Sequence, residues 1–119
     1  MKYMIMMFGD QATMMESRTP EWVGEMIEFM DKLDGELKEA GEFVDGQGLA
    51  DPTQAKTIRI ANDVPVATDG PFAEAKESLA GYMIVEAAEE RAIEIASRMV
   101  EFLQEPVEVR QVMDAAPDM

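Results

Sequence analysis

Two short segments place apolar side chains on both of their faces, and they constrain the fold more than any other feature of the sequence. They are Tyr3–Phe8, which reads YMIMMF, and Leu79–Ala87, where Tyr82 and Ile84 alternate with Met83 and Val85. A β-strand with two apolar faces is covered on both sides. We therefore expect both segments to lie in the centre of a sheet.

Two amphipathic helices accompany these strands. Thr19 and Pro20 begin the first helix as its N-cap and first helical residue, and Gly41 ends it. The second helix spans Ala88–Gln104, and Pro106 prevents it from continuing. The apolar stripes are Trp22, Met26, Met30, Leu33 and Leu37 in the first helix and Ala92, Ile95, Ala96, Met99 and Leu103 in the second.

The remaining strands complete an α+β pattern. Lys56–Ala61 and Val107–Met113 alternate apolar and polar residues, and Glu42–Ala50 is predicted as a short, irregular strand. Val64–Thr68 is expected to return from a turn at 62–63 as a short hairpin arm. The order β-α-β-β-α-β, with this extra arm, is typical of a ferredoxin-like domain with an antiparallel sheet. In that topology the first and third main strands are central, and we expect the two alternating strands at the edges.

Residues 1–113 are predicted to form this single domain, followed by a flexible tail at 114–119. Both helices are expected on one face of the sheet, so the second apolar face of the central strands has no cover within the chain. An uncovered apolar sheet face usually marks an interface. We therefore predict a homodimer in which two sheets pack face to face.

The composition excludes several classes of function. The 119 residues include no cysteine and no histidine, which removes disulfides, thiolate chemistry and the commonest general base and metal ligand. Neither a metal nor another cofactor is expected. The net charge of −15, from 25 acids and 10 bases, argues against nucleic-acid binding. The apolar run at residues 3–8 is too short for a signal peptide or a membrane span, so we expect no membrane association and a cytoplasmic protein.

The turn Asp69-Gly70-Pro71-Phe72 has two interpretations. In the structural one, Asp69 accepts backbone hydrogen bonds, Gly70 supplies unusual dihedral angles, Pro71 fixes φ, and Phe72 plugs the end of the core. In the functional one, Asp69 faces a pocket and is a catalytic candidate.

The charged residues that follow this turn also have two interpretations. Glu74, Lys76 and Glu77 either form a solvated turn with weak ion pairs, or they contribute to a site. In such a site Glu74 would act as a general base and Lys76 would bind an anionic substrate.

Three further candidates come from other strands. Arg59, opposite Ile58 and Ile60, would either grip a ligand carboxylate or pair with an acid such as Asp69 across an interface. Asp10 either forms the turn after the first strand or supplies a carboxylate to a pocket. Tyr82 is either a core or interface aromatic residue or a ligand-binding phenol.

The stretch TDGPFAEAKESLAGYMIVE, Thr68 to Glu86, closely resembles the signature of the DGPF branch of the YCII-related family. The opening MKYMIMMFGD and the segment VEVRQV, Val107 to Val112, resemble that family as well, so the resemblance spans nearly the whole chain. It implies a dimeric α+β barrel. Members of the DGPF branch are largely uncharacterised, and some are encoded beside extracytoplasmic-function sigma factors. A histidine–aspartate pair suggested as an active site in the wider family cannot exist in this chain.

Two functions are compatible with these features. The first is the binding, with or without transformation, of a small organic molecule in a pocket between sheet and helices. Any reaction there would be proton transfer assisted by carboxylates or lysine. The alternative is a non-catalytic regulatory or interaction module whose protein partner could be a sigma factor. The sequence leaves open whether the protein is an enzyme.

Overall fold

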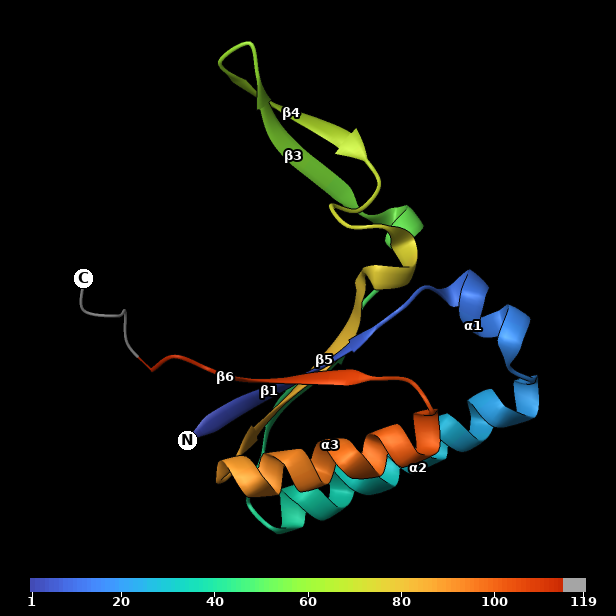
Figure 1. Cartoon of the computed structure of the whole chain (residues 1–119), viewed down its shortest axis with the longest axis vertical. Coiled ribbons are helices and arrows are strands. Elements are labelled where there is room, and N and C mark those ends of the chain that lie inside the picture. The colour runs from blue at the N-terminus through green and yellow to red at the C-terminus, as the bar shows by residue number, and fades with distance from the viewer. Residues whose placement is uncertain (115–119) are drawn as a thin grey trace.

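The apolar pattern of the strands is reproduced in the sheet of the computed structural model, which describes residues 1–114 (Figure 1). Four strands form an antiparallel sheet in the order β2-β5-β1-β6. Their bounds are β1, Lys2–Phe8; β2, Phe43–Gly48; β5, Leu79–Glu86; and β6, Val107–Gln111. The two segments with apolar residues on both faces, β1 and β5, are the central strands, as predicted. The protein is thus an α+β protein with an antiparallel sheet.

Two long helices lie side by side on one side of the sheet (Figure 1). They are α2, Pro20–Glu39, and α3, Glu89–Leu103. The predicted start of α2 is confirmed, because the backbone N–H of Trp22 donates to the Thr19 hydroxyl at 3.1 Å. Gly41, with φ of +73°, follows its end. The indole of Trp22 and the ring of Phe29 both stack on Phe102, which joins α2 to α3.

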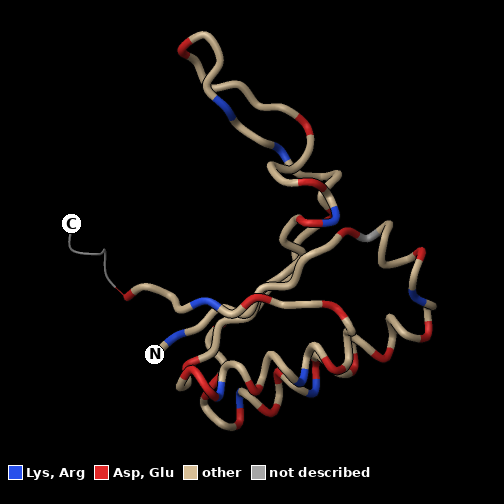
Figure 2. The backbone as a smooth tube through the Cα atoms, in the orientation of Figure 1, with Lys and Arg blue, Asp and Glu red and all other residues tan. Residues whose placement is uncertain are grey.

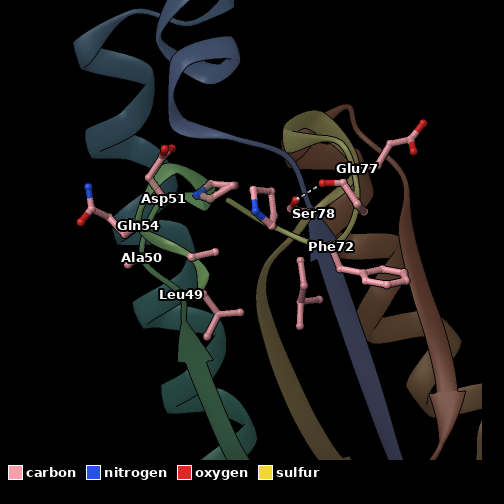
Figure 3. A pocket seen from close by; sticks show the side chains of 12 residues that line it. Leu49, Ala50, Asp51, Gln54, Phe72, Glu77 and Ser78 are labelled. Carbon is pink, nitrogen blue, oxygen red and sulfur yellow. Dashed lines mark hydrogen bonds between the residues drawn. The ribbon is translucent and has the colours of Figure 1, made fainter. Parts of the chain in front are cut away.

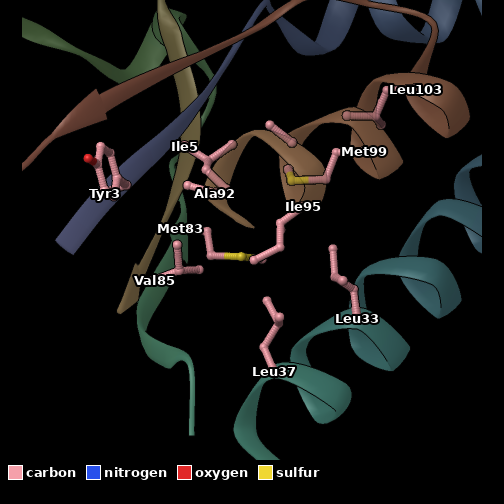
Figure 4. Packing of buried hydrophobic residues seen from close by; sticks show 11 residues of the cluster. Tyr3, Ile5, Leu33, Leu37, Met83, Val85, Ala92, Ile95, Met99 and Leu103 are labelled. Carbon is pink, nitrogen blue, oxygen red and sulfur yellow. The ribbon is translucent and has the colours of Figure 1, made fainter. Parts of the chain in front are cut away.

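The core fills the space between these helices and the sheet (Figure 4). Side chains from the sheet and from both helices have no exposed surface there: Ile5, Leu33, Leu37, Val85, Ile95 and Met99. Burying each such side chain stabilises the fold by about 1.5–3 kcal/mol before entropy is counted. Both predicted helix stripes contribute to this core, whereas Ile27, beside the first stripe, is 53% exposed.

A short helix, α1 (Gln11–Ser17), was not predicted from the sequence. Asp10 is its N-cap, since the backbone N–H of Thr13 donates to Asp10 Oδ1 at 3.0 Å. The helix escapes pattern analysis because it carries no apolar stripe, and Met15 is 67% exposed. After it, Arg18 Nη2 donates to the carbonyl of Leu103 at 2.6 Å and so ties this segment to the end of α3.

The prediction that Lys56–Ala61 is an edge strand of the main sheet is wrong. This segment, β3, pairs with β4 (Val64–Asp69) in a separate two-stranded sheet that projects from the body (Figure 1). We call residues 56–69 the arm. The prediction failed because apolar and polar residues alternate in any strand whose two faces differ, whether the strand lies in the main sheet or in the arm. The second main strand is β2, whose strand signal is interrupted by Gly46 and Gly48 and whose pairing with β5 contains an irregularity.

The arm changes the dimensions of the molecule. The radius of gyration is 16.5 Å, whereas a compact domain of this length has about 13.5 Å. Residues 58–69 are all exposed. The arm therefore has no packing against the body along most of its length.

The face of the main sheet opposite the helices is also apolar. Register places Met6 opposite Tyr82 and Met4 opposite Ile84 on this outer face. Figure 1 shows α2 and α3 on the other side. The homodimer expected from this face stays a prediction.

No helix within residues 1–114 is long and apolar enough to cross a membrane. The flexible tail predicted at 114–119 falls, apart from its first residue, outside the described residues.

Candidate functional site

An open hollow of about 380 Å³ lies at the base of the arm (Figure 3). One wall comes from residues 49–55, which follow β2 and include a 3-10 turn, η1 (Pro52–Gln54). The other comes from residues 71–79, which include a second such turn, η2 (Ala75–Glu77). The lining consists of Leu49, Ala50, Asp51, Pro52, Gln54, Ala55, Pro71, Phe72, Ala73, Glu77, Ser78 and Leu79. Figure 3 shows the carboxylates of Asp51 and Glu77 turned away from the side chains of Leu49 and Phe72. The hollow is therefore mainly apolar.

Backbone hydrogen bonds fix the Asp-Gly-Pro-Phe turn against this hollow. The N–H of Gly70 donates to the carbonyl of Ala55 at 2.9 Å, and the Thr57 hydroxyl donates to the carbonyl of Gly70 at 2.7 Å. Gly70 has φ of +102°, a conformation that side-chain-bearing residues rarely adopt. The carboxylate of Asp69 pairs with the ammonium of Lys56. The structural interpretation is confirmed for Gly70, whereas the described contact of the Asp69 side chain is Lys56 and not the backbone N–H groups that this interpretation expected.

Phe72 does not plug the core. Its side chain is 82% exposed, and its ring lies 5.3 Å from the Arg59 guanidinium carbon. The prediction failed because the turn follows the projecting arm and lies outside the core. Phe72 instead forms the rim of the hollow, with Arg59 above it.

Arg59 differs from the other arginines of this acidic chain. It is the only arginine within residues 1–114 with no carboxylate closer than 4.0 Å. Each of the other four arginines has a carboxylate within this distance, in the pairs Arg18–Glu105, Arg91–Glu42, Arg98–Glu36 and Arg110–Glu108. Its described contact is the face of Phe72. Because strand residues alternate in direction, Arg59 and Asp69 lie on opposite faces of the arm, and Lys56 is the partner of Asp69.

The remaining predicted site residues lie elsewhere. Asp10 caps α1. Glu74 is exposed just before η2, where its carbonyl accepts the Ser78 hydroxyl at 3.0 Å. Lys76 lines a second hollow, of about 410 Å³, beside Phe8 and β6. The structure therefore brings Arg59 together with the Asp-Gly-Pro-Phe turn and places Asp10, Glu74 and Lys76 outside the lining of that hollow.

Tyr82 projects from the outer face of the sheet. Its hydroxyl donates to Asp45 Oδ2 at 3.1 Å. This hydrogen bond, with burial and the negative charge of Asp45, raises the pKa of the Tyr82 phenol above its usual value. The phenol is therefore a hydrogen-bond donor at neutral pH and is already engaged within its own chain.

Within residues 1–114, no group of three or more carboxylates is placed to hold a metal ion.

The profile of the YCII-related domain matches residues 1–116. The chain belongs to the YCII-related family. No curated protein sequence matches it closely enough to be named as a relative. Family membership covers almost the whole domain, but it assigns no reaction to the hollow of this YCII-related protein.

Sequence reasoning missed the apolar wall of the hollow. It expected a pocket between sheet and helices, a space that this YCII-related protein fills with core side chains. The wall is formed by Leu49, Pro52 and Leu79, which come from two distant segments. The short stretch Ala50-Asp51-Pro52 indicates a turn, but nothing in it indicates which surface it faces.

Proposed function

We propose that this YCII-related protein, as a member of the DGPF branch, binds a small organic molecule with an apolar body and an anionic group. The binding site is the hollow at the base of the arm. One observation carries the proposal: Arg59, the one arginine without a carboxylate partner within residues 1–114, stacks on Phe72, and Phe72 lines an apolar hollow. The ligand supplies the anion that Arg59 lacks among these residues.

The size and chemistry of the hollow support this class of ligand. Small-molecule sites usually measure about 300–1,000 Å³ and combine an apolar lining with a few polar groups, and this hollow measures about 380 Å³. An arginine binds a carboxylate through two parallel hydrogen bonds, and an arginine stacked on an aromatic ring is held in place for that contact. Phe72 provides both the ring and part of the apolar surface.

The proposal is limited to binding. The two carboxylates of the lining, Asp51 and Glu77, point away from the apolar side chains in Figure 3. Proton transfer by Glu77 would require its side chain to turn towards the ligand. A hollow without an inward-facing base favours recognition over catalysis.

The assembly in this proposal is a ferredoxin-like domain that forms a sheet-to-sheet homodimer. The sequence order of the elements supports the first part. The partly exposed apolar residues Met4 and Ile84 on the outer face support the second.

The test compares two aromatic probes of equal shape, naphthalene-1-carboxylate and naphthalene-1-methanol, by isothermal titration calorimetry. The carboxylate is expected to bind, and Arg59→Gln is expected to weaken it about tenfold while leaving the alcohol unchanged. Arg110→Gln, another exposed arginine, is the matched control. Leu49→Asp is expected to abolish binding of both probes. Absence of binding to the wild-type protein at millimolar probe, or unchanged binding in Leu49→Asp, would contradict the proposal.

The alternative, a non-catalytic regulatory module that contacts a sigma factor or another protein, stays a prediction. A labelled arm that shows no change in fluorescence anisotropy with a purified sigma factor would count against it.

A further inference from the structure

The arm carries apolar side chains on both of its faces, and both faces are exposed. Ile58 and Ile60, on one face, are 61% and 71% exposed; Val64 and Val66, on the other, are 54% and 40% exposed. An isolated two-stranded hairpin is only marginally stable in water. A hairpin with two bare apolar faces therefore needs a covering surface.

The arm also leaves both of its strand edges open. Within residues 1–114, β3 pairs with β4 and neither strand has a second neighbour. Free strand edges pair readily with another chain. The α2 and α3 helices, which could have covered the arm, lie at the opposite end of the molecule (Figure 1).

The distribution of charge favours a second copy of the same chain as the covering surface. The arm contains two bases, Lys56 and Arg59, and two acids, Asp63 and Asp69, so it is neutral in a chain of net charge −15. Figure 2 shows the acids gathered along the helices instead. The arm is thus the segment that another acidic copy can approach without strong repulsion. Arg59, which has no carboxylate partner within residues 1–114, can find one there.

The arm and the hollow form one continuous surface. The Arg59 guanidinium lies over the ring of Phe72, and Phe72 lines the hollow. A body that covers the Arg59 face of the arm therefore also covers the mouth of the hollow.

We infer that the arm of each protomer docks against a second copy of the chain, and that the hollow becomes an enclosed site only in this assembly. The second half of this inference rests on the function proposed above. Each face of a six-residue hairpin is about 20 Å by about 10 Å. If both faces of both arms are covered, and an equal area is buried on the surfaces that cover them, the total buried area is about 1,600 Å². This is the standard size of a specific interface.

The first experiment measures association by sedimentation velocity across micromolar concentrations. The arm variant is Ile58→Ser with Ile60→Ser, and the matched control is Ile27→Ser with Ile93→Ser, two helix residues that are 53% and 49% exposed. The arm variant is expected to weaken the dimer at least about tenfold, and the control to leave it unchanged. A wild-type monomer, or a dimer that the arm variant does not weaken, overturns the inference.

The second experiment guards against misfolding of the variant, because it uses the wild-type protein alone. Amide hydrogen exchange of residues 56–69 is measured at two protein concentrations. Docking is expected to protect these amides more strongly at the higher concentration. Rapid exchange at both concentrations in a protein that is dimeric would show a dimer that leaves the arm free, and it would overturn the inference.

A ligand-binding measurement distinguishes failure of the proposed binding function from failure of the inferred enclosure. The affinity for naphthalene-1-carboxylate is measured in the arm variant, whose Arg59 and hollow are intact. Enclosure by the partner predicts about a tenfold loss of affinity. Equal affinity would overturn enclosure while leaving the binding function in place. If the wild-type protein does not bind the probe, both the proposed binding function and the enclosure are overturned. The docking of the arm is then still decided by the first two measurements.

Discussion

Arg91 holds Glu42 through two parallel hydrogen bonds. Its Nε donates to Glu42 Oε2 at 2.8 Å and its Nη2 donates to Oε1 at 3.0 Å. The pair joins the first turn of α3 to the residue before β2, so it fixes an edge strand of the sheet to the helix layer. The hydrogen bonds from Arg91, partly opposed by burial, hold the pKa of the Glu42 carboxyl below its usual value.

Acid is therefore expected to weaken the protein through this pair. A carboxyl with a lowered pKa in the folded state contributes stability above its unfolded pKa, and loses that contribution as the pH falls through the folded value. Arg91→Lys keeps the charge but loses the paired geometry. It is expected to cost about 1 kcal/mol at pH 7, given the partial exposure of the pair, and to flatten the decline below about pH 4.5.

Urea unfolding at pH 7 and at pH 3 checks this expectation. Arg98→Lys is the control, because Arg98 has a single described carboxylate contact, with Glu36. Equal stability of Arg91→Lys and the wild-type protein at pH 7 would show that the paired geometry contributes nothing.

A second carboxyl behaves in the opposite way. Asp34 Oδ1 is buried and has no hydrogen-bond partner among residues 1–114. Burial raises the pKa of Asp34, while Lys38 opposes the increase and Asp31 adds to it. A raised pKa destabilises the fold above the folded value, and this cost disappears as the pH falls. Asp34→Asn is expected to stabilise the protein by about 1 kcal/mol at pH 7 and by little near pH 4.

Thermal unfolding across this pH range measures the effect of Asp34→Asn. Glu25→Gln, on an exposed part of the same helix, is the control and should change little. A melting temperature of Asp34→Asn that falls below the wild-type value at pH 7 would rule out the unfavourable charge.

The central strands and the long helices could be predicted because their patterns depend on local burial. The apolar residues on both faces of Tyr3–Phe8 and Leu79–Ala87 are visible whichever strands these segments pair with. Thr19 caps its helix through a contact with a residue only three positions away. The arm could not be distinguished from an edge strand, because the alternation in Lys56–Ala61 is the same in both. Its location depends on which segments pair, a non-local property.

The candidate site was less predictable for the same reason. Residue type identified Arg59 and the Asp-Gly-Pro-Phe turn, which the structure does bring together. It also offered Asp10, Lys76 and Tyr82 as candidates beside their structural interpretations. Their positions depend on the tertiary fold, and they lie away from the hollow. Phe72 was expected in the core because it is aromatic, but its place at the base of the arm exposes it.

The two tyrosines should both resist ionisation. The hydrogen bond to Asp45 raises the pKa of Tyr82, and burial raises the pKa of Tyr3, with Glu89 and Glu90 adding to the effect. Absorbance at 295 nm is expected to show less than half of the tyrosine ionised at pH 10, the usual midpoint. Asp45→Asn removes the charge and should lower the pKa of Tyr82 alone. Normal ionisation of one tyrosine in the wild-type protein at pH 10 would contradict the hydrogen bond or the burial.

Two glycines should respond to alanine in opposite directions. A Cβ on Gly81 of β5 would lie 3.0 Å from the carbonyl oxygen of Gln47 in the neighbouring strand β2 and 3.4 Å from the Cα of Gly48. Gly81→Ala must therefore push β2 away and is expected to cost about 1–3 kcal/mol. Gly35, inside α2, has nothing within 4 Å of such a Cβ, so Gly35→Ala should stabilise the protein by about 0.5–1 kcal/mol. Urea midpoints of the two variants measure both effects, and amide exchange in residues 43–48 should rise in Gly81→Ala alone. Equal midpoints would show that β2 accommodates the methyl group freely, and that its pairing with β5 is looser than these distances imply.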